Sequence, residues 1–210
     1  MHSPASRVLI AVERPVGVLK QGCSSTPGAH ITNCYSLSLT SNATQQLDSG
    51  FPDSPRQRIE FLTKGSADGT SHTYKWRYYL SSQTGTTTRF FHLMQVFSRG
   101  DNAAIVTLDA VKGQFAVEDN FRNCSVTRCP SVAISQFTDR TTLHAMTVTF
   151  GPTGKLRYIV TDADTGANIL SYTASGKMGS QSTSLKFGLY RATVSGMTAA
   201  SANLGDFTSS

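Results

Sequence analysis

Alternation of apolar and polar residues with a period of two dominates this chain. Because successive side chains of a strand point to opposite faces, this period predicts β-strands with one face suited to burial. The pattern recurs at 56–64, 72–81, 89–98, 103–111, 143–151, 155–163, 167–174, 184–192 and 202–209. The segments between them are rich in Gly, Ser, Asp and Thr, which favour turns. The chain is therefore predicted to be all-β, with nine strands.

The connections between these strands favour a β-sandwich. The stretch 145–192 carries the turn sequences GPTG and DADTG at its hairpin tips and predicts an antiparallel meander. No segment carries a helical apolar stripe of three turns, and at most one short helical turn is expected, near 137–142. Two antiparallel sheets packed as a β-sandwich jelly roll, with a concave groove on one sheet, bury one face of every strand most simply.

Composition agrees with this architecture and narrows the class of partner. The 210 residues are 15% charged and suit one domain spanning 1–210, in which 1–20 is expected to be a poorly defined N-terminal strand region. A net charge of +6 favours anionic partners. The basic residues are scattered and form no nucleic-acid-binding motif, so we expect an acidic polysaccharide as partner and no nucleic acid. We expect no membrane contact, because no segment could span a bilayer. We also expect a monomer.

The four cysteines indicate where the protein works. They form two close pairs, and local pairing predicts the disulfides Cys23–Cys34 and Cys124–Cys129 among three formal connectivities. Disulfides indicate an oxidising compartment. The N-terminal segment does not resemble a secretory leader, so we interpret the chain as a mature extracellular form whose leader has been removed.

Three of the predicted strands carry polar residues on one shared face. These residues are Arg56, Arg58 and Glu60 in the first strand, Gln95 in the second, and Lys186 and Tyr190 in the third. In the third strand, Phe187 and Leu189 take the opposite, core-facing side, and Gly188 is expected to leave room for a ligand. The same alternation places His92 on the core face of its strand. On the outer face of a curved sheet, the polar set would line a groove that attracts anions.

The polar residues lie within motifs that resemble a known family. The segments 58–61 (RIEF), 95–97 (QVF) and 186–190 (KFGLY) resemble, in the same order, the strand motifs of the family 7 alginate lyases, R-(T/S)-E-L, Q-(I/V)-H and K-A-G-x-Y. Fungal glucuronan lyases share that fold, and 73–80 is similar to them. The resemblance implies a concanavalin A-like jelly roll and a secreted polysaccharide lyase. Its substrate would be an acidic, uronic-acid-containing polysaccharide such as glucuronan or alginate, cleaved by β-elimination.

The resemblance also implies roles for individual residues. Gln95 and Arg58 would neutralise the substrate carboxylate, and Tyr190 would serve as the acid and often as the base. Lys186 and Arg58 are expected to favour the phenolate of Tyr190 by their charge. The expected substrate-binding residues are Lys186, Glu60, Arg56 and Tyr79.

One position departs from the family pattern. The alginate lyases have a histidine two residues after the glutamine, where this chain has Phe97. The candidates to replace it are His72 and His92. His72 is preferred, because it begins a predicted strand and is expected to overhang the groove, whereas His92 is expected in the core.

A rival function and a metal ion stay open at this point. A non-catalytic, lectin-like carbohydrate-binding module would use the same sandwich, and the loss of the histidine at Phe97 favours it. A retaining glycosidase is disfavoured, because only Glu60 supplies a carboxylate on a suitable strand. The lyase chemistry requires no cofactor, and a structural Ca²⁺ ion with Asp206 as a ligand stays open.

Overall fold

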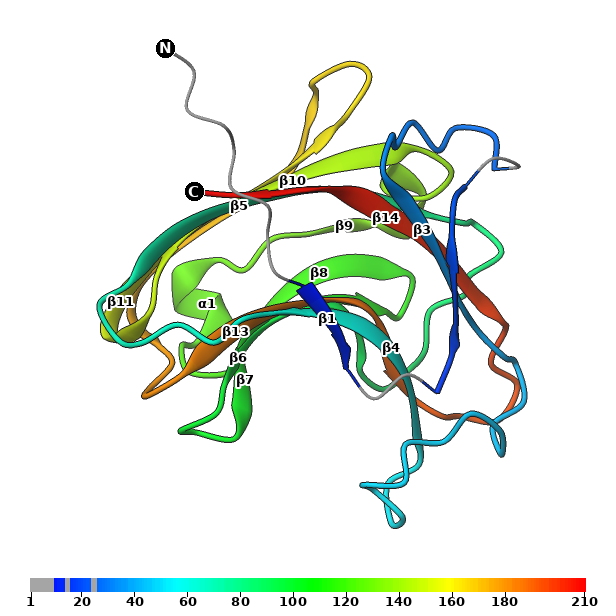
Figure 1. Ribbon diagram of the computed structural model, residues 1–210, viewed down its shortest axis with the longest axis horizontal. Coiled ribbons are helices and arrows are strands. Elements are labelled where there is room, and N and C mark those ends of the chain that lie inside the picture. Colours follow the sequence, from blue (N-terminus) through cyan, green and yellow to red (C-terminus); the bar gives the residue numbers. More distant parts are fainter. Residues whose placement is uncertain (1–9, 14–15, 24–25) are drawn as a thin grey trace.

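The computed structural model describes residues 10–13, 16–23 and 26–210. These residues form two seven-stranded antiparallel sheets that pack face to face (Figure 1). The predicted all-β sandwich of the jelly-roll type is thereby confirmed. Figure 1 shows that the two sheets arch in the same sense, so that the outer face of the lower sheet is its hollow side.

Sheet A is the upper layer in Figure 1. In spatial order its strands are β12 (Asn168–Met178), β11 (Gly151–Asp162), β10 (Thr141–Thr149), β5 (Ser71–Leu80), β14 (Ala200–Ser209), β3 (Cys34–Leu39) and β2 (Val18–Gln21). Strands β10, β11 and β12 form the predicted meander. Because tight turns join these three strands, local sequence determines their register.

Sheet B is the lower layer and has the concave outer face. In spatial order its strands are β1 (Ile10–Glu13), β4 (Arg56–Thr63), β13 (Thr183–Ala192), β6 (Phe91–Ser98), β7 (Ala103–Val111), β8 (Gln114–Asp119) and β9 (Ser131–Ala133). The meander was predicted to extend to residue 192, but it ends with β12, because β13 belongs to sheet B. All ten residues of β13 are buried, which suits a central strand and not the edge position that a longer meander would give it.

The pattern of period two misses several short elements. All nine predicted strands are present in the described residues, and β1 and β2 begin within the region 1–20, which was expected only as a poorly defined strand region; β3, β8 and β9 were not predicted. Most of these are too short to repeat the alternation often enough to be distinguished from loops. The helical turn expected near 137–142 is wrong, because β10 already begins at Thr141. The described helical segments are α1 (Cys124–Thr127) and a 3₁₀ turn at Ile134–Gln136.

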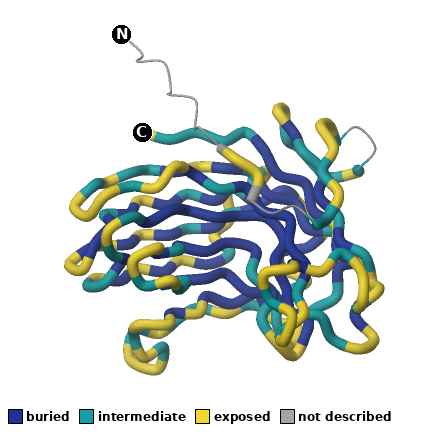
Figure 2. Tube along the Cα trace, turned by 60° about the horizontal axis from the view of Figure 1, so that its bottom comes forward, coloured by how far each residue is buried: buried dark blue, intermediate teal, exposed yellow. Residues whose placement is uncertain are grey.

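Aromatic side chains fill the core between the sheets, where the tube in Figure 2 is dark. The ring of Trp76 in β5 stacks on those of His144 and Phe187, with centroids 4.8 Å and 5.3 Å apart. The His144 ring bonds the Tyr158 hydroxyl at 2.6 Å through Nδ1 and the Thr142 hydroxyl at 3.0 Å through Nε2. Phe187 thus anchors β13 in the core, as its face predicted.

The buried His144 should make the fold sensitive to acid. Burial lowers the pKa of His144 from 6.5 to about 3. The unfolded chain takes up a proton below its pKa of 6.5 while the folded protein stays neutral there, so stability falls as pH decreases from 6.5 towards 3. The loss by pH 4 is roughly 3 kcal/mol. Urea unfolding at pH 7 and pH 4 should therefore show a smaller loss in His144→Gln than in the wild type, and equal losses would contradict the assignment.

Both predicted disulfides, Cys23–Cys34 and Cys124–Cys129, are present. In the expected N-terminal strand region 1–20, β1 pairs with β4 and β2 pairs with β3, and the rest of its strand prediction lies outside the described residues. No helix in the described part of the chain is long and apolar enough to cross a membrane.

Candidate functional site

The three strands that carry the motifs are neighbours in sheet B. Strand β13 lies between β4 and β6 and is antiparallel to both. Tyr190 of β13 is directly opposite Arg58 on one side and His92 on the other. Residues opposite each other in a sheet have Cβ atoms about 5 Å apart. The motifs therefore meet in one patch of the concave face, although they are far apart in the sequence.

His92 lies on this outer face and not in the core, so its predicted side is wrong. The register of β6 shifts beside His92 in its pairing with β13 and again with β7. After this irregularity, Leu93 and Met94 are both buried in the core. The His92 side chain keeps 16% of its exposure, and its ring lies 5.6 Å from that of Tyr190. A bulge of this kind shifts the face of a residue without changing the local composition.

Tyr190 is held by cations and an aromatic ring. Its hydroxyl accepts a hydrogen bond from Nη1 of Arg56 at 2.9 Å. The guanidinium carbon of Arg58 lies 4.1 Å from the centre of the Tyr190 ring, and the ring of Phe90 lies 5.1 Å away. The residue is 7% exposed. A fixed phenol with a cation at its oxygen is suited to exchanging a proton with a ligand.

Asp109 of β7 orients His92. Its carboxylate pairs with Nδ1 of His92, and Asp109 itself is buried. A carboxylate at Nδ1 favours the neutral tautomer in which Nε2 is free to accept a proton. Phe90 stacks on the other side of the imidazole, with centroids 4.8 Å apart. Asp109 was not predicted as a site residue, and the available signal was a lone acid in the apolar segment 103–111.

A layer of buried charged and polar residues supports Arg56, His92 and Tyr190. Nε2 of Gln95 donates to Oε1 of Glu60 at 2.6 Å. Burial raises the pKa of Glu60, although the charges of Lys186 and Arg58 oppose this shift. Arg58 is in turn paired with Asp48 at 2.9 Å, in the loop that precedes β4. Asp48 was not predicted, because a loop residue shows no face in the sequence.

Phe97 covers this layer at the position where the family pattern has histidine. The Lys186 ammonium lies 3.8 Å from the centre of the Phe97 ring. A phenyl ring stabilises the cation through its face but cannot exchange a proton. The described patch obtains its imidazole instead from His92, three residues before Gln95.

Two predicted site residues, His72 and Tyr79, lie elsewhere. Both belong to β5 in sheet A. The His72 ring bonds the Ser66 hydroxyl at 3.0 Å, and Ser66 pairs with Thr183, seven residues before Tyr190 on β13. At about 3.3 Å per strand residue, Thr183 is about 23 Å along β13 from Tyr190, and His72 lies at the Thr183 end. The Tyr79 hydroxyl donates to Asp139. Their predicted places at the groove are therefore wrong.

Gly188 was predicted to leave room for a ligand, and this prediction is wrong. The space beside Gly188 is filled by the backbone of β4. A Cβ atom there would overlap the carbonyl oxygen of Ile59 and lie 2.8 Å from Cα of Glu60. Its φ of +152° is also one that L-residues rarely adopt. Gly188 therefore allows β4 and β13 to approach each other, which brings Arg58 beside Tyr190.

The replacement Gly188→Ala is expected to destabilise the protein by about 3 kcal/mol, because overlap and backbone strain act together. Gly166 is the matched control, since it has a φ of +72° and no atom within 4 Å of an added Cβ. Gly166→Ala should cost only about 1 kcal/mol. Urea unfolding measures both, and equal losses would show that the contact with β4 is unimportant.

Asp206, the predicted calcium ligand, lies in sheet A. Its carboxylate accepts the backbone N–H groups of Thr32 at 3.0 Å and Asn33 at 2.8 Å. The Nε atom of Arg77 lies 3.7 Å from it. Within the described ranges, no group of three or more His, Cys, Asp or Glu side chains could hold a metal ion. A calcium ion at Asp206 stays a prediction.

Similar proteins were found by structure and not by sequence. No family model and no curated protein matches the chain. The endo-β-1,4-glucuronan lyase of the fungus Trichoderma reesei superposes with a TM-score of 0.63 at 10% identity, over 95% of this chain and 89% of the enzyme. A family 7 alginate lyase with bound substrate gives 0.57 at 11% identity, over 85% and 78%.

A sugar-binding protein that is named as a lectin and not as a lyase also shares the fold. The lectin UEA-II in complex with galactose gives a TM-score of 0.53 at 10% identity, over 95% of this chain and 92% of the lectin. Identities this low establish a common fold and leave the activity to the site. The chain therefore has the jelly-roll fold that the glucuronan and alginate lyases share with this lectin.

Proposed function

We propose that this protein is a secreted polysaccharide lyase that cleaves an acidic, uronic-acid-containing polysaccharide by β-elimination. The observation that carries the proposal is the group of Arg56, His92 and Tyr190 on the concave face of sheet B. Tyr190 contacts both of the other two, through the hydrogen bond from Arg56 at 2.9 Å and through the His92 ring at 5.6 Å. The net charge of +6 favours association of the protein with an anionic polymer.

The reaction requires a base, an acid and a site for the carboxylate. A base removes the proton from C5 of the uronate, and the electrons of that C–H bond form the C4–C5 double bond. The bond between C4 and the linking oxygen breaks, and an acid protonates the departing oxygen. The uronate carboxylate must be held by donors, since negative charge develops beside it.

The residues of the patch meet these requirements. We assign the C5 proton to Nε2 of His92, which the Asp109 pair leaves as the acceptor. Tyr190 donates the proton to the leaving oxygen and regains one from His92 through water. Arg56 and the amide of Gln95 bind the carboxylate, while Arg58, Glu60 and Lys186 hold these groups from below. No cofactor takes part in these steps.

The comparisons support this assignment. Two of the structures that share the fold are named as lyases of glucuronan and alginate, which are uronic-acid polymers. The substrate complex of the alginate lyase was obtained with one histidine replaced by asparagine and one tyrosine by phenylalanine. The proposed mechanism likewise assigns its proton transfers to one histidine and one tyrosine.

The rival function is sugar binding without cleavage. The fold shared with a galactose-binding lectin and the presence of Phe97 favour it. Incubation with polyglucuronate, alginate and heparin-like chains separates the two functions when chain length is followed by size-exclusion chromatography. A lyase shortens at least one of these polymers, whereas a lectin-like module leaves all of them at full length.

A further inference from the structure

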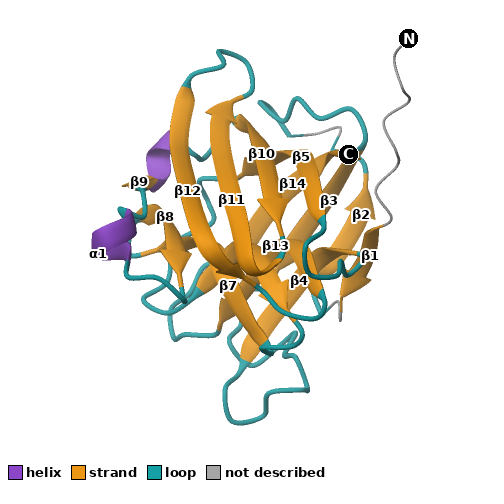
Figure 3. Cartoon of the chain, turned by 90° about the vertical axis from the view of Figure 1, so that its left-hand side faces the viewer, coloured by secondary structure: helices purple, strands orange, loops and turns teal. Residues whose placement is uncertain are grey.

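A pocket lies on sheet B, outside the proposed reacting group. It has a volume of about 290 Å³ and is bounded by the β7–β8 hairpin, β9 and the loop that contains α1. Figure 3 shows β8, β9 and α1 together at one end of the sandwich. The polar residues that line the pocket are Lys112, Gln114, Glu118 and Ser131. Its volume is near the lower end, about 300 Å³, of the range for small-ligand sites.

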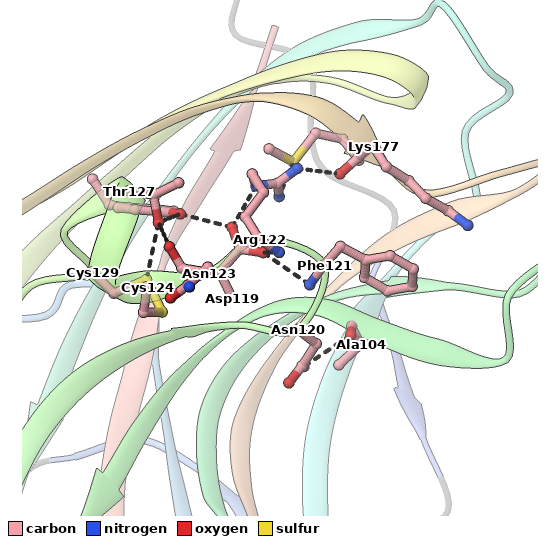
Figure 4. Close-up of polar contacts among 12 residues, drawn as sticks. Ala104, Asp119, Asn120, Phe121, Arg122, Asn123, Cys124, Thr127, Cys129 and Lys177 are labelled. Carbon is pink, nitrogen blue, oxygen red and sulfur yellow. Dashed lines mark hydrogen bonds and ion pairs between the residues drawn. A yellow bond between two sulfur atoms is a disulfide. The ribbon is translucent and has the colours of Figure 1, made fainter.

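The loop that walls this pocket is fixed in place. The disulfide Cys124–Cys129 closes it, and both cysteines line the pocket. In Figure 4 Arg122 connects the loop to both sheets, because it pairs with Asp119 at 2.7 Å and donates to the carbonyl of Lys177 at 2.8 Å. Asp119 also accepts the hydroxyl of Tyr172 at 2.7 Å. The pocket is thus formed before any ligand binds.

The pocket adjoins the proposed reacting group. On β7, Asp109 is directly opposite Ala116, which lines the pocket. Asp109 is also the partner of His92, and Thr107 lies between Gln95 and Glu118 in the register. Two strand spacings therefore separate the pocket from the reacting group, a distance of about 10 Å. A polymer bound across the strands would pass from one to the other.

The charges around the pocket disfavour another carboxylate. Partial burial raises the pKa of Glu118, and the negative charge of the nearby Asp109 raises it further. The charges of Lys112 and His92 lower this pKa. A ligand carboxylate at Glu118 would add a third negative group beside Glu118 and Asp109, and Lys112 is the cation among the residues that line the pocket. Carboxylate, amide and hydroxyl groups together are instead suited to pairing with sugar hydroxyls, which both donate and accept.

We propose that this pocket binds an uncharged sugar residue through its hydroxyl groups and that Glu118 excludes a uronate from it. The inference rests on the proposed function, since it takes the ligand to be a polysaccharide that crosses sheet B. It extends that function by dividing the concave face. Uronate is bound at Arg56 and Tyr190, and a residue without a carboxylate is bound beside Glu118.

Two matched probes test the proposal. They are the β-1,4-linked tetramers of glucose and of glucuronate, which differ only in a hydroxymethyl or carboxylate group at C6. Binding is followed by the NMR shifts of the backbone amides of Gln114, Ala116 and Ser131, in the Tyr190→Phe variant so that neither probe is cleaved. The glucose tetramer is expected to shift these amides with a Kd about tenfold lower than that of the glucuronate tetramer.

Changing the charge of Glu118 should change this preference. Glu118→Gln is expected to remove most of the tenfold preference, and Glu118→Lys to reverse it. Asp68→Lys is the matched control for Glu118→Lys, because it makes the same change in net charge at an exposed turn between β4 and β5. It should leave the preference within about twofold.

The outcomes separate this proposal from the proposed function. Absence of shifts at the three pocket amides with the glucose tetramer would overturn the pocket assignment, as would an unchanged preference in Glu118→Lys. The proposed function fails by a different result, namely when the glucuronate tetramer shifts no amide of β4 or β13 and the wild type cleaves no acidic polymer. Binding of the glucose tetramer would then still be read directly at the pocket.

Discussion

Tyr190→Phe is expected to lower the rate of polymer cleavage by at least about 100-fold, because positioned general acids contribute this much or more. The change removes only the hydroxyl oxygen that accepts from Arg56 at 2.9 Å. The ring contacts with Arg58 and Phe90 remain, so the fold and the KM for the polymer should change little. Initial rates on polyglucuronate, measured together with thermal unfolding, check this result. Activity retained in full would remove Tyr190 from the mechanism.

His92→Gln is expected to cause a loss of similar size, about 100-fold or more in kcat, because the variant keeps a polar side chain but cannot take the C5 proton. His72→Gln is the matched control at a histidine of sheet A. It should retain activity within about twofold, since surface and remote positions seldom affect catalysis by more.

The two variants together test whether the base lies on sheet B, at His92, or on sheet A, at His72. A large loss in His72→Gln together with full activity in His92→Gln would contradict the placement of the reacting group on sheet B. Loss in both variants with a lowered thermal midpoint would instead indicate damage to the fold. Circular dichroism of each variant therefore accompanies the rates.

The sequence predicts the site well where strands are regular. In β13, alternation correctly separated Phe187 in the core from Tyr190 on the outer face. In β4 it placed Arg56 on the face shared with Arg58, and the structure adds that Arg56 bonds the hydroxyl of Tyr190 on the neighbouring strand. Both strands pair without a slip between Arg56 and Leu62, so a period of two describes their faces throughout.

The sequence does not predict what depends on irregular or distant pairing. His92 changes face because the register of β6 shifts next to it. His72 was misplaced because local alternation does not show to which sheet a strand belongs. The partners of β5 are β10 and β14, which lie far along the chain. The role of Gly188 depends on the backbone of β4, and this contact is visible only in three dimensions.

Loops supply the remaining parts of the site. Asp48 pairs with Arg58 from a loop, and the disulfide loop lines the pocket beside Glu118. Their conformations follow from contacts with both sheets and not from a repeating pattern. From the sequence, only the cysteine spacing predicted that a disulfide closes the loop between Cys124 and Cys129.

The ultraviolet absorbance of the product tests the central claim most directly, since only elimination creates a conjugated C4–C5 double bond. Purified wild-type protein is incubated with polyglucuronate, and this absorbance is compared with the number of new reducing ends. We predict that both rise in proportion with the wild type and that neither rises with Tyr190→Phe. New reducing ends without absorbance would identify a hydrolase. No change with polyglucuronate, alginate or heparin-like chains would contradict the assignment of a lyase.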